Sequence, residues 1–205
     1  YKSITRSDII MEFFEVIKKR RSIRKYMPDP VQKEDILKIL EAANWAPSAL
    51  DLQPWEFLVV SGDKKNKLGN NYGKIVDNYT KDWDEAPDKA FMPRTEFIQF
   101  ANVYGGAPVI IVVLTEASND PNYQKGYLES ASAAMENILL AATALGLGGC
   151  WMLGPLEDEN YLRQVLEIPD NKEIVAITPV GYPAIIPQPR PRRDPDLIQK
   201  VIWLE

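Results

Sequence analysis

The chain contains no histidine and a single cysteine, Cys150, among its 205 residues. Without histidine, the common zinc sites and every Ser-His or Cys-His catalytic arrangement are excluded. A lone cysteine cannot form an intrachain disulfide. The sequence therefore predicts no metal site and no catalytic side chain, and the chemistry is expected to come from a bound reagent.

Long apolar runs are missing as well. The longest uninterrupted one, residues 107–114, is far shorter than the roughly 20 residues that span a bilayer. No charged segment followed by an apolar one opens the chain, as it would in a secretory signal. We expect a cytoplasmic protein with no membrane partner.

Positive charge is in deficit, since 24 Lys and Arg residues face 29 Asp and Glu residues and the net charge is -5. This balance disfavours non-specific binding to nucleic acid. The known phosphate loops are also absent, because Gly146, Gly148 and Gly149 do not complete a Gly-x-Gly-x-x-Gly motif before a helix. The sequence supports neither an ATPase nor a Rossmann dehydrogenase.

Apolar residues make up 45% of the chain, enough to bury one core, and no linker divides two cores, so we expect a single domain over residues 1–205. Apolar periodicity predicts helices over residues 8–20, after Pro30, over 123–145 and near 157–166. Strands are expected over residues 56–61, 108–115, 149–153 and 173–180. The first two of these should be central strands.

Two segments are expected outside the core. Residues 70–104 are polar, aromatic and interrupted by Pro87 and Pro93, which favours a surface lid or a peripheral helical insertion. Residues from about 183 to 205 begin with a proline-rich stretch that cannot pair as an interior strand. We expect this C-terminal arm to embrace a partner subunit, and the small residues of the 123–145 helix to suit a dimer interface.

Basic residues dominate positions 18–25, where six of eight are cationic. The spacing of Arg20, Ser22 and Arg24 lets two guanidinium groups and a hydroxyl converge on one phosphate. A solvated basic helix end is an equally good interpretation of this run alone. A second set, Arg190, Arg192 and Arg193, lies on the arm, where solvent exposure is the favoured interpretation.

The segment Ala46–Trp55 is an irregular turn between a helix and a strand. Its small polar groups could hydrogen-bond a flat heterocycle, or the turn could simply end the helix. Taken in order, four motifs along the chain resemble those of the nitroreductase family: Arg20-Arg21-Ser22-Ile23-Arg24, Pro47-Ser48 with Gln53-Pro54-Trp55, Leu145-Gly146-Leu147-Gly148, and Val180-Gly181-Tyr182-Pro183. The resemblance runs from about Ile17 to Ile198.

The resemblance implies an α+β fold with a central, mostly antiparallel sheet flanked by helices, in an intertwined homodimer with two FMN sites at the subunit interface. Arg20 and Ser22, in the run that includes Arg21, would hold the FMN phosphate together with Arg190 and Arg192. Arg24 would approach the pyrimidine edge of the ring and stabilise the anionic reduced flavin.

The remaining ring contacts follow from the same resemblance. Pro47, Ser48 and Ala49 would line the ring from the partner subunit, with Gln53 nearby, while the backbone of Met152, Leu153 and Gly154 would face flavin N5. Asp51 stands where the family usually has asparagine. An ionised carboxylate accepts hydrogen bonds but does not donate them, which puts ring contact by Asp51 in doubt.

The implied activity is a ping-pong transfer of hydride from NADH or NADPH, through flavin N5, to a small planar acceptor such as a nitroaromatic or a quinone. Aromatic residues of 70–104 would shape the acceptor pocket: Tyr72, Tyr79, Trp83, Phe91, Phe97 and Phe100. Three alternatives stay open: a narrow flavoenzyme of the same superfamily such as a reductive dehalogenase, a flavin-binding or flavin-processing protein without NAD(P)H turnover, and a non-flavin interaction module.

Overall fold

The computed structural model describes residues 12–83 and 92–204. Its helices are α1 (Phe13–Lys19), α2 (Lys33–Asn44), α3 (Gly62–Tyr79), α4 (Arg94–Val103), α5 (Pro121–Ala144) and α6 (Glu159–Leu166). Its strands are β1 (Trp55–Val60), β2 (Val109–Glu116), β3 (Gly148–Gly149) and β4 (Lys172–Gly181). Short 3-10 turns lie at Ala49–Asp51, Tyr104–Gly106 and Gly154–Asp158. The α+β class and the antiparallel sheet flanked by helices are confirmed.

The four strands form one antiparallel sheet in the order β1-β2-β4-β3. The expectation of a central strand is correct for β2, which pairs with β1 on one side and β4 on the other. It is wrong for β1, which lies at the edge, and its Val59 is 46% exposed. A short apolar run looks the same in sequence whether one neighbour or two will pair with it.

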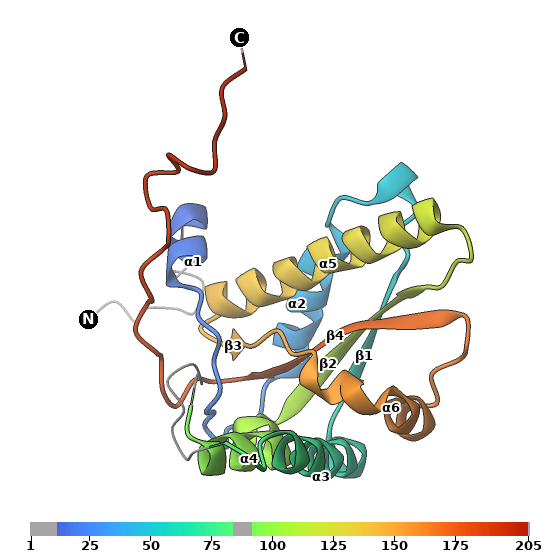
Figure 1. Ribbon diagram of the computed structural model, residues 1–205, viewed down its shortest axis with the longest axis vertical. Coiled ribbons are helices and arrows are strands. Elements are labelled where there is room, and N and C mark those ends of the chain that lie inside the picture. The colour runs from blue at the N-terminus through green and yellow to red at the C-terminus, as the bar shows by residue number, and fades with distance from the viewer. Residues whose placement is uncertain (1–11, 84–91, 205) are drawn as a thin grey trace.

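Helices cover both faces of the sheet, with α3, α4 and α6 on one side and α2 and α5 on the other (Figure 1). Successive residues of β2 point to opposite faces. Ile110, Val112 and Leu114 pack in the core under α3 and α4, whereas Ile111 and Val113 pack under α2 and α5. Burial on both faces explains why this strand is an unbroken apolar run.

The prediction that residues 70–104 lie outside the core is wrong for the described part of that segment. The side chains at α3 positions Leu68, Tyr72 and Val76 recur every four residues and face the core. Tyr72 is 5% exposed and Tyr104 is fully buried. Residues 84–91, which include Pro87 and Phe91, lie outside the described residues.

The other predicted elements are present with changed bounds, and residues 8–11 of the first predicted helix lie outside the described residues. The long helix and the last strand are confirmed as α5 and β4, but the strand predicted over 149–153 shrinks to β3 and one isolated bridge from Met152 to Ile177. The C-terminal arm runs extended past α1 and away from the body (Figure 1). It is tethered where the Ala184 amide donates to the Lys25 carbonyl at 2.9 Å.

Candidate functional site

The basic motif forms an extended strip beside β3. The Ile23 amide donates to the Gly149 carbonyl at 3.0 Å, and Ser22 forms a parallel bridge with Gly149. A Cβ on Gly148 would lie 2.3 Å from an Ile23 side-chain carbon, so glycine is required for this approach. Ile23 is buried, whereas Ser22 and Arg24 line one cavity. Arg20, at the end of α1, acts on the Cys150 thiol together with Ser22 and Arg24, so these three side chains approach one place.

The arginines of this strip have different surroundings. Arg20 lies with its Nε 3.8 Å from Glu136 Oε1 of α5, and Arg24 donates from Nη1 to the Ser22 carbonyl at 3.3 Å. Arg21 points away and donates from Nη1 to the carbonyls of Lys18 and Arg20, both at 2.7 Å. Arg21 therefore caps the end of α1 rather than joining the other two.

A pocket of about 810 Å³ opens beside this strip. Arg24 lines it together with Cys150 and three residues predicted for the site, Met152, Leu153 and Gly154. Five aromatic side chains from α3, α4 and the turn after α3 also line the pocket and are here called the aromatic wall: Tyr72, Tyr79, Trp83, Phe97 and Phe100. Five of the six aromatic residues expected around the acceptor thus line one pocket, and Phe91 is outside the described residues.

Three buried polar groups lie in or beside the pocket, and two of them, Cys150 and Tyr104, were not among the residues predicted for it. Burial raises the pKa of the Cys150 thiol, although Arg24 and a hydrogen bond with Ser22 oppose the shift. A protonated, buried thiol is a weak nucleophile. Burial likewise raises the pKa of Tyr72 and of Tyr104, whose stacked rings lie 6.1 Å apart. The sequence offered no signal for Cys150 beyond its position three residues before Leu153.

The turn Ala46–Trp55 is held by its own hydrogen bonds and by α5. The Ala49 amide donates to Ser130 Oγ at 3.0 Å, the Gln53 amide donates to Ser48 Oγ at 3.2 Å, and Gln53 Nε2 donates to Asp51 Oδ1 at 3.0 Å. Leu50, Asp51 and Gln53 have positive φ angles. This exposed, left-handed backbone is a feature that a simple helix end does not need.

The turn lies at the opposite end of α5 from α1 and β3 (Figure 1). None of Pro47, Ser48, Ala49, Asp51 and Gln53 lines the pocket that contains Arg24. One chain therefore presents two separate groups of predicted site residues. The first is the Arg20–Arg24 strip with residues 152–154, and the second is the turn.

The arm approaches the first group. Pro187, Gln188 and Pro189 line a cavity of about 430 Å³ together with Lys19 and Arg21. Arg190 and Arg192 follow directly along the chain and are exposed. Their sharing of one phosphate with Arg20 stays a prediction.

Among the described residues, no three side chains of the His, Cys, Asp or Glu type gather as a metal site would require. Within the same part of the chain, no helix combines the length and apolarity needed to cross a membrane.

Comparison with known proteins identifies the class. The model of the nitroreductase family matches residues 17–182. A Methanothermobacter thermautotrophicus protein named "Putative NADH dehydrogenase/NAD(P)H nitroreductase" is 36% identical over 200 residues, which cover 94% of this chain and 88% of that protein. The chain belongs to the nitroreductase family of flavoprotein oxidoreductases.

Other relatives show how widely the family extends. Iodotyrosine deiodinase 1 of Rattus norvegicus is 31% identical over 93% of this chain and 67% of its own length. A solved nitroreductase family protein from Clostridium novyi NT is 32% identical, with a TM-score of 0.65 over 84% of this chain and 86% of that one. The fold also matches a nitroreductase with bound FMN from Bacteroides fragilis, at 23% identity and a TM-score of 0.70 over 95% of this chain and all of that one.

Proposed function

We propose that this protein is an FMN-dependent NAD(P)H oxidoreductase that reduces small planar acceptors such as nitroaromatics and quinones. One observation carries the proposal: Arg24, Met152, Leu153 and Gly154 line the same pocket as the five rings of the aromatic wall. A flat acceptor can stack against such a wall while a fixed cation acts on one edge of the site.

The residues of the strip fit FMN. Arg20 and Ser22 both act on the Cys150 thiol, and Gly148 lets Ile23, between them and Arg24, lie directly against β3. Charge-assisted hydrogen bonds from arginine are the preferred contacts for a phosphate. Arg20 and Ser22 would hold the phosphate with Arg190 and Arg192 of the arm.

Arg24 would act at the pyrimidine edge of the ring, where a cation favours the reduced form. The backbone of Leu153 and Gly154 would supply an N–H donor to the ring. When bound, FMN would accept hydride from NAD(P)H and pass it to the acceptor. The chain itself then needs no histidine and no other side-chain acid or base.

The separation of the two groups along α5 supports a homodimer. An isologous contact places the same surface patch of each subunit against its counterpart, so a turn at one end of α5 can meet a strip at the other end of the partner's helix. Pro47, Ser48, Ala49 and Gln53 would then complete the site of the partner subunit. Exposed apolar side chains on α1, at the end of α2, on the turn and on the arm fit such a contact: Phe13, Phe14, Trp45, Leu50, Ile186 and Trp203.

The proposal is tested by mixing the FMN-reconstituted protein anaerobically with NADH or NADPH and following flavin absorbance. We expect rapid bleaching, then reoxidation by both a quinone and a nitroaromatic compound. A flavin that stays oxidised with both nicotinamides would contradict the proposal and favour a flavin-binding protein without NAD(P)H turnover. A protein that takes up no FMN would favour a non-flavin interaction module.

Reductive dehalogenation is the second candidate, favoured by the 31% identity to iodotyrosine deiodinase 1 over nearly the whole chain. An iodinated phenol in the same acceptor panel distinguishes the two. Halide release from that phenol, with little reoxidation of the reduced flavin by quinones, would favour reductive dehalogenation over the reduction of nitroaromatics and quinones.

A further inference from the structure

The aromatic wall continues as a chain of ring contacts beyond the pocket surface. Tyr79 meets Trp83 edge to face with ring centroids 5.4 Å apart, Trp83 meets Phe97 at 6.4 Å, and Phe97 meets Tyr72 at 6.4 Å. Tyr72 then stacks on the buried Tyr104. Each ring therefore depends on its neighbours for position, and Trp83 links the exposed Tyr79 to the buried rings of Phe97, Tyr72 and Tyr104.

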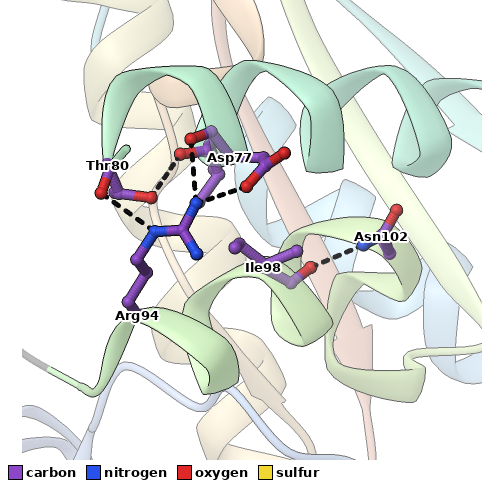
Figure 2. A network of polar contacts seen from close by, with 6 residues as sticks. Asp77, Thr80, Arg94, Ile98 and Asn102 are labelled. Carbon is purple, nitrogen blue, oxygen red and sulfur yellow. Dashed lines mark hydrogen bonds and ion pairs between the residues drawn. The ribbon is translucent and has the colours of Figure 1, made fainter. Parts of the chain in front are cut away.

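The helices that carry these rings are joined tightly at one level. A Cβ on Gly69 would lie 2.2 Å from the Asn102 carbonyl oxygen, and one on Gly73 would lie 2.2 Å from Asn102 Oδ1. The Asn102 side chain in turn donates to the Ile98 carbonyl at 2.9 Å (Figure 2). The contacts of Gly69 and Gly73 with Asn102 fix the distance between α3 and α4 at this height along the helices. A single region of contact does not fix the angle between the two helix axes.

Arg94 provides a second region of contact between α3 and α4. Figure 2 shows its guanidinium group, on the first residue of α4, reaching the last turn of α3. Nε donates to the Thr80 carbonyl at 2.9 Å, and Nη2 donates to the Asp77 carbonyl at 3.3 Å and forms an ion pair with the Asp77 carboxylate. The Asp77 carbonyl is one of the last four of α3, which a helix end leaves without intrahelical partners.

The same contacts reach the aromatic wall. The Trp83 amide donates to the Thr80 carbonyl at 2.9 Å, so one oxygen binds both Arg94 and the backbone of Trp83. Arg94 does not line the pocket. It can influence a bound acceptor only through the rings that it helps to hold.

We propose that Arg94 is a positioning residue that fixes Trp83 and the C-terminal end of α3, and thereby sets the affinity of the pocket for its acceptor. The inference rests on the proposed function for its kinetic test. Preorganised walls favour binding because the side chains are ordered before the ligand arrives. Loosening the wall should weaken acceptor binding without changing how FMN is held.

The test compares Arg94→Ala with Arg163→Ala. Arg163 is a matched control because it also bridges carbonyls, donating to Pro169 and Lys172 at 3.0 and 2.8 Å, and pairs with Glu159, but does not line the pocket. We expect Arg94→Ala to raise the acceptor KM about tenfold, with kcat and the FMN dissociation constant within about twofold of the wild type. Arg94→Lys, which keeps the charge but not the two-pronged donor geometry, should fall between.

A second readout does not require FMN or turnover. Acrylamide quenching of Trp83 fluorescence, obtained as the difference from a Trp83→Phe variant, should increase in Arg94→Ala and Arg94→Lys but not in Arg163→Ala. If Arg94→Ala fails to fold, the Arg94→Lys comparison carries the test. Quenching and acceptor KM that change no more in the Arg94 variants than in Arg163→Ala would overturn the proposal. A wild-type protein that binds no FMN would contradict the proposed function while leaving the quenching test intact.

Discussion

The arginines of the basic run at residues 18–25 differ in their contacts, so that only some of them approach the candidate FMN site. Arg20, Ser22 and Arg24 all act on the Cys150 thiol, whereas Arg21 donates to two carbonyls at the end of α1. The sequence showed the spacing, but the contacts of Arg21 depend on where α1 ends.

At this scale we predict that Arg20→Ala weakens FMN binding by about 1.5–3 kcal/mol, because it removes a charge-assisted phosphate contact. Arg192→Ala should do the same. Lys19→Ala and Arg193→Ala are matched controls that change charge by the same amount on the same segments. Fluorescence titration with FMN measures the affinity of all four variants. Equal affinities in the four variants would contradict the assignment of the FMN phosphate to Arg20 and Arg192.

The resemblance leaves ring contact by Asp51 in doubt, and the Asp51 carboxylate accepts a hydrogen bond from Gln53 Nε2. If the partner's flavin lies beside this turn, the negative charge opposes flavin reduction. Asp51→Asn keeps an acceptor for Gln53 and should raise the flavin potential by on the order of 20–40 mV. Redox titration measures it; a potential unchanged from that of the wild type would place Asp51 away from the ring.

Whole elements explain where prediction from the sequence succeeded and failed. Strand β2 was located because its apolar run is buried on both faces. Residues 70–104 were misjudged because polar exposed positions of α3 and α4 outnumber the buried ones, and two prolines masked the helical period. Ring contacts such as Tyr72 with Tyr104 follow only from the packing of α3 against α4.

The close contact of α3 with α4 gives a prediction at the scale of elements. Gly69→Ala would place a Cβ against the Asn102 carbonyl, a backbone atom that cannot move aside easily. We expect a loss of about 1–3 kcal/mol in the free energy of unfolding, measured by urea denaturation. Asn70→Ala, on the exposed side of the same turn, should change stability by about 0.5 kcal/mol or less. Equal losses in the two variants would mean that the helices do not pack this closely.

Within one chain, the residues predicted for the FMN site lie in two separate places. The motifs Arg20–Arg24, Pro47–Ser48 and residues 152–154 were all identified in the sequence, but one chain gathers only the first and third. Motif order along a sequence carries no information on which subunit supplies each part. The proposed homodimer would bring the two groups together, and it would give the exposed apolar side chains of the arm a surface to contact.

An obligate homodimer should persist at the lowest concentration at which light scattering can be measured. If each FMN site is built from both subunits, the subunits cannot separate without losing FMN. Dilution should therefore cause subunit dissociation and FMN release at the same protein concentration. A folded monomer that retains FMN would contradict the shared site.

The most direct test of the account combines two damaged subunits. Arg20→Glu damages the strip, and Ser48→Trp blocks the turn that would serve the partner's site, so each variant alone should bind little FMN. After the two are unfolded together and refolded as a mixture, half of the dimers are mixed and each mixed dimer has one intact site, which restores about a quarter of the wild-type FMN binding. No recovery above the separate variants would show that each site is built within one chain, and would contradict the account.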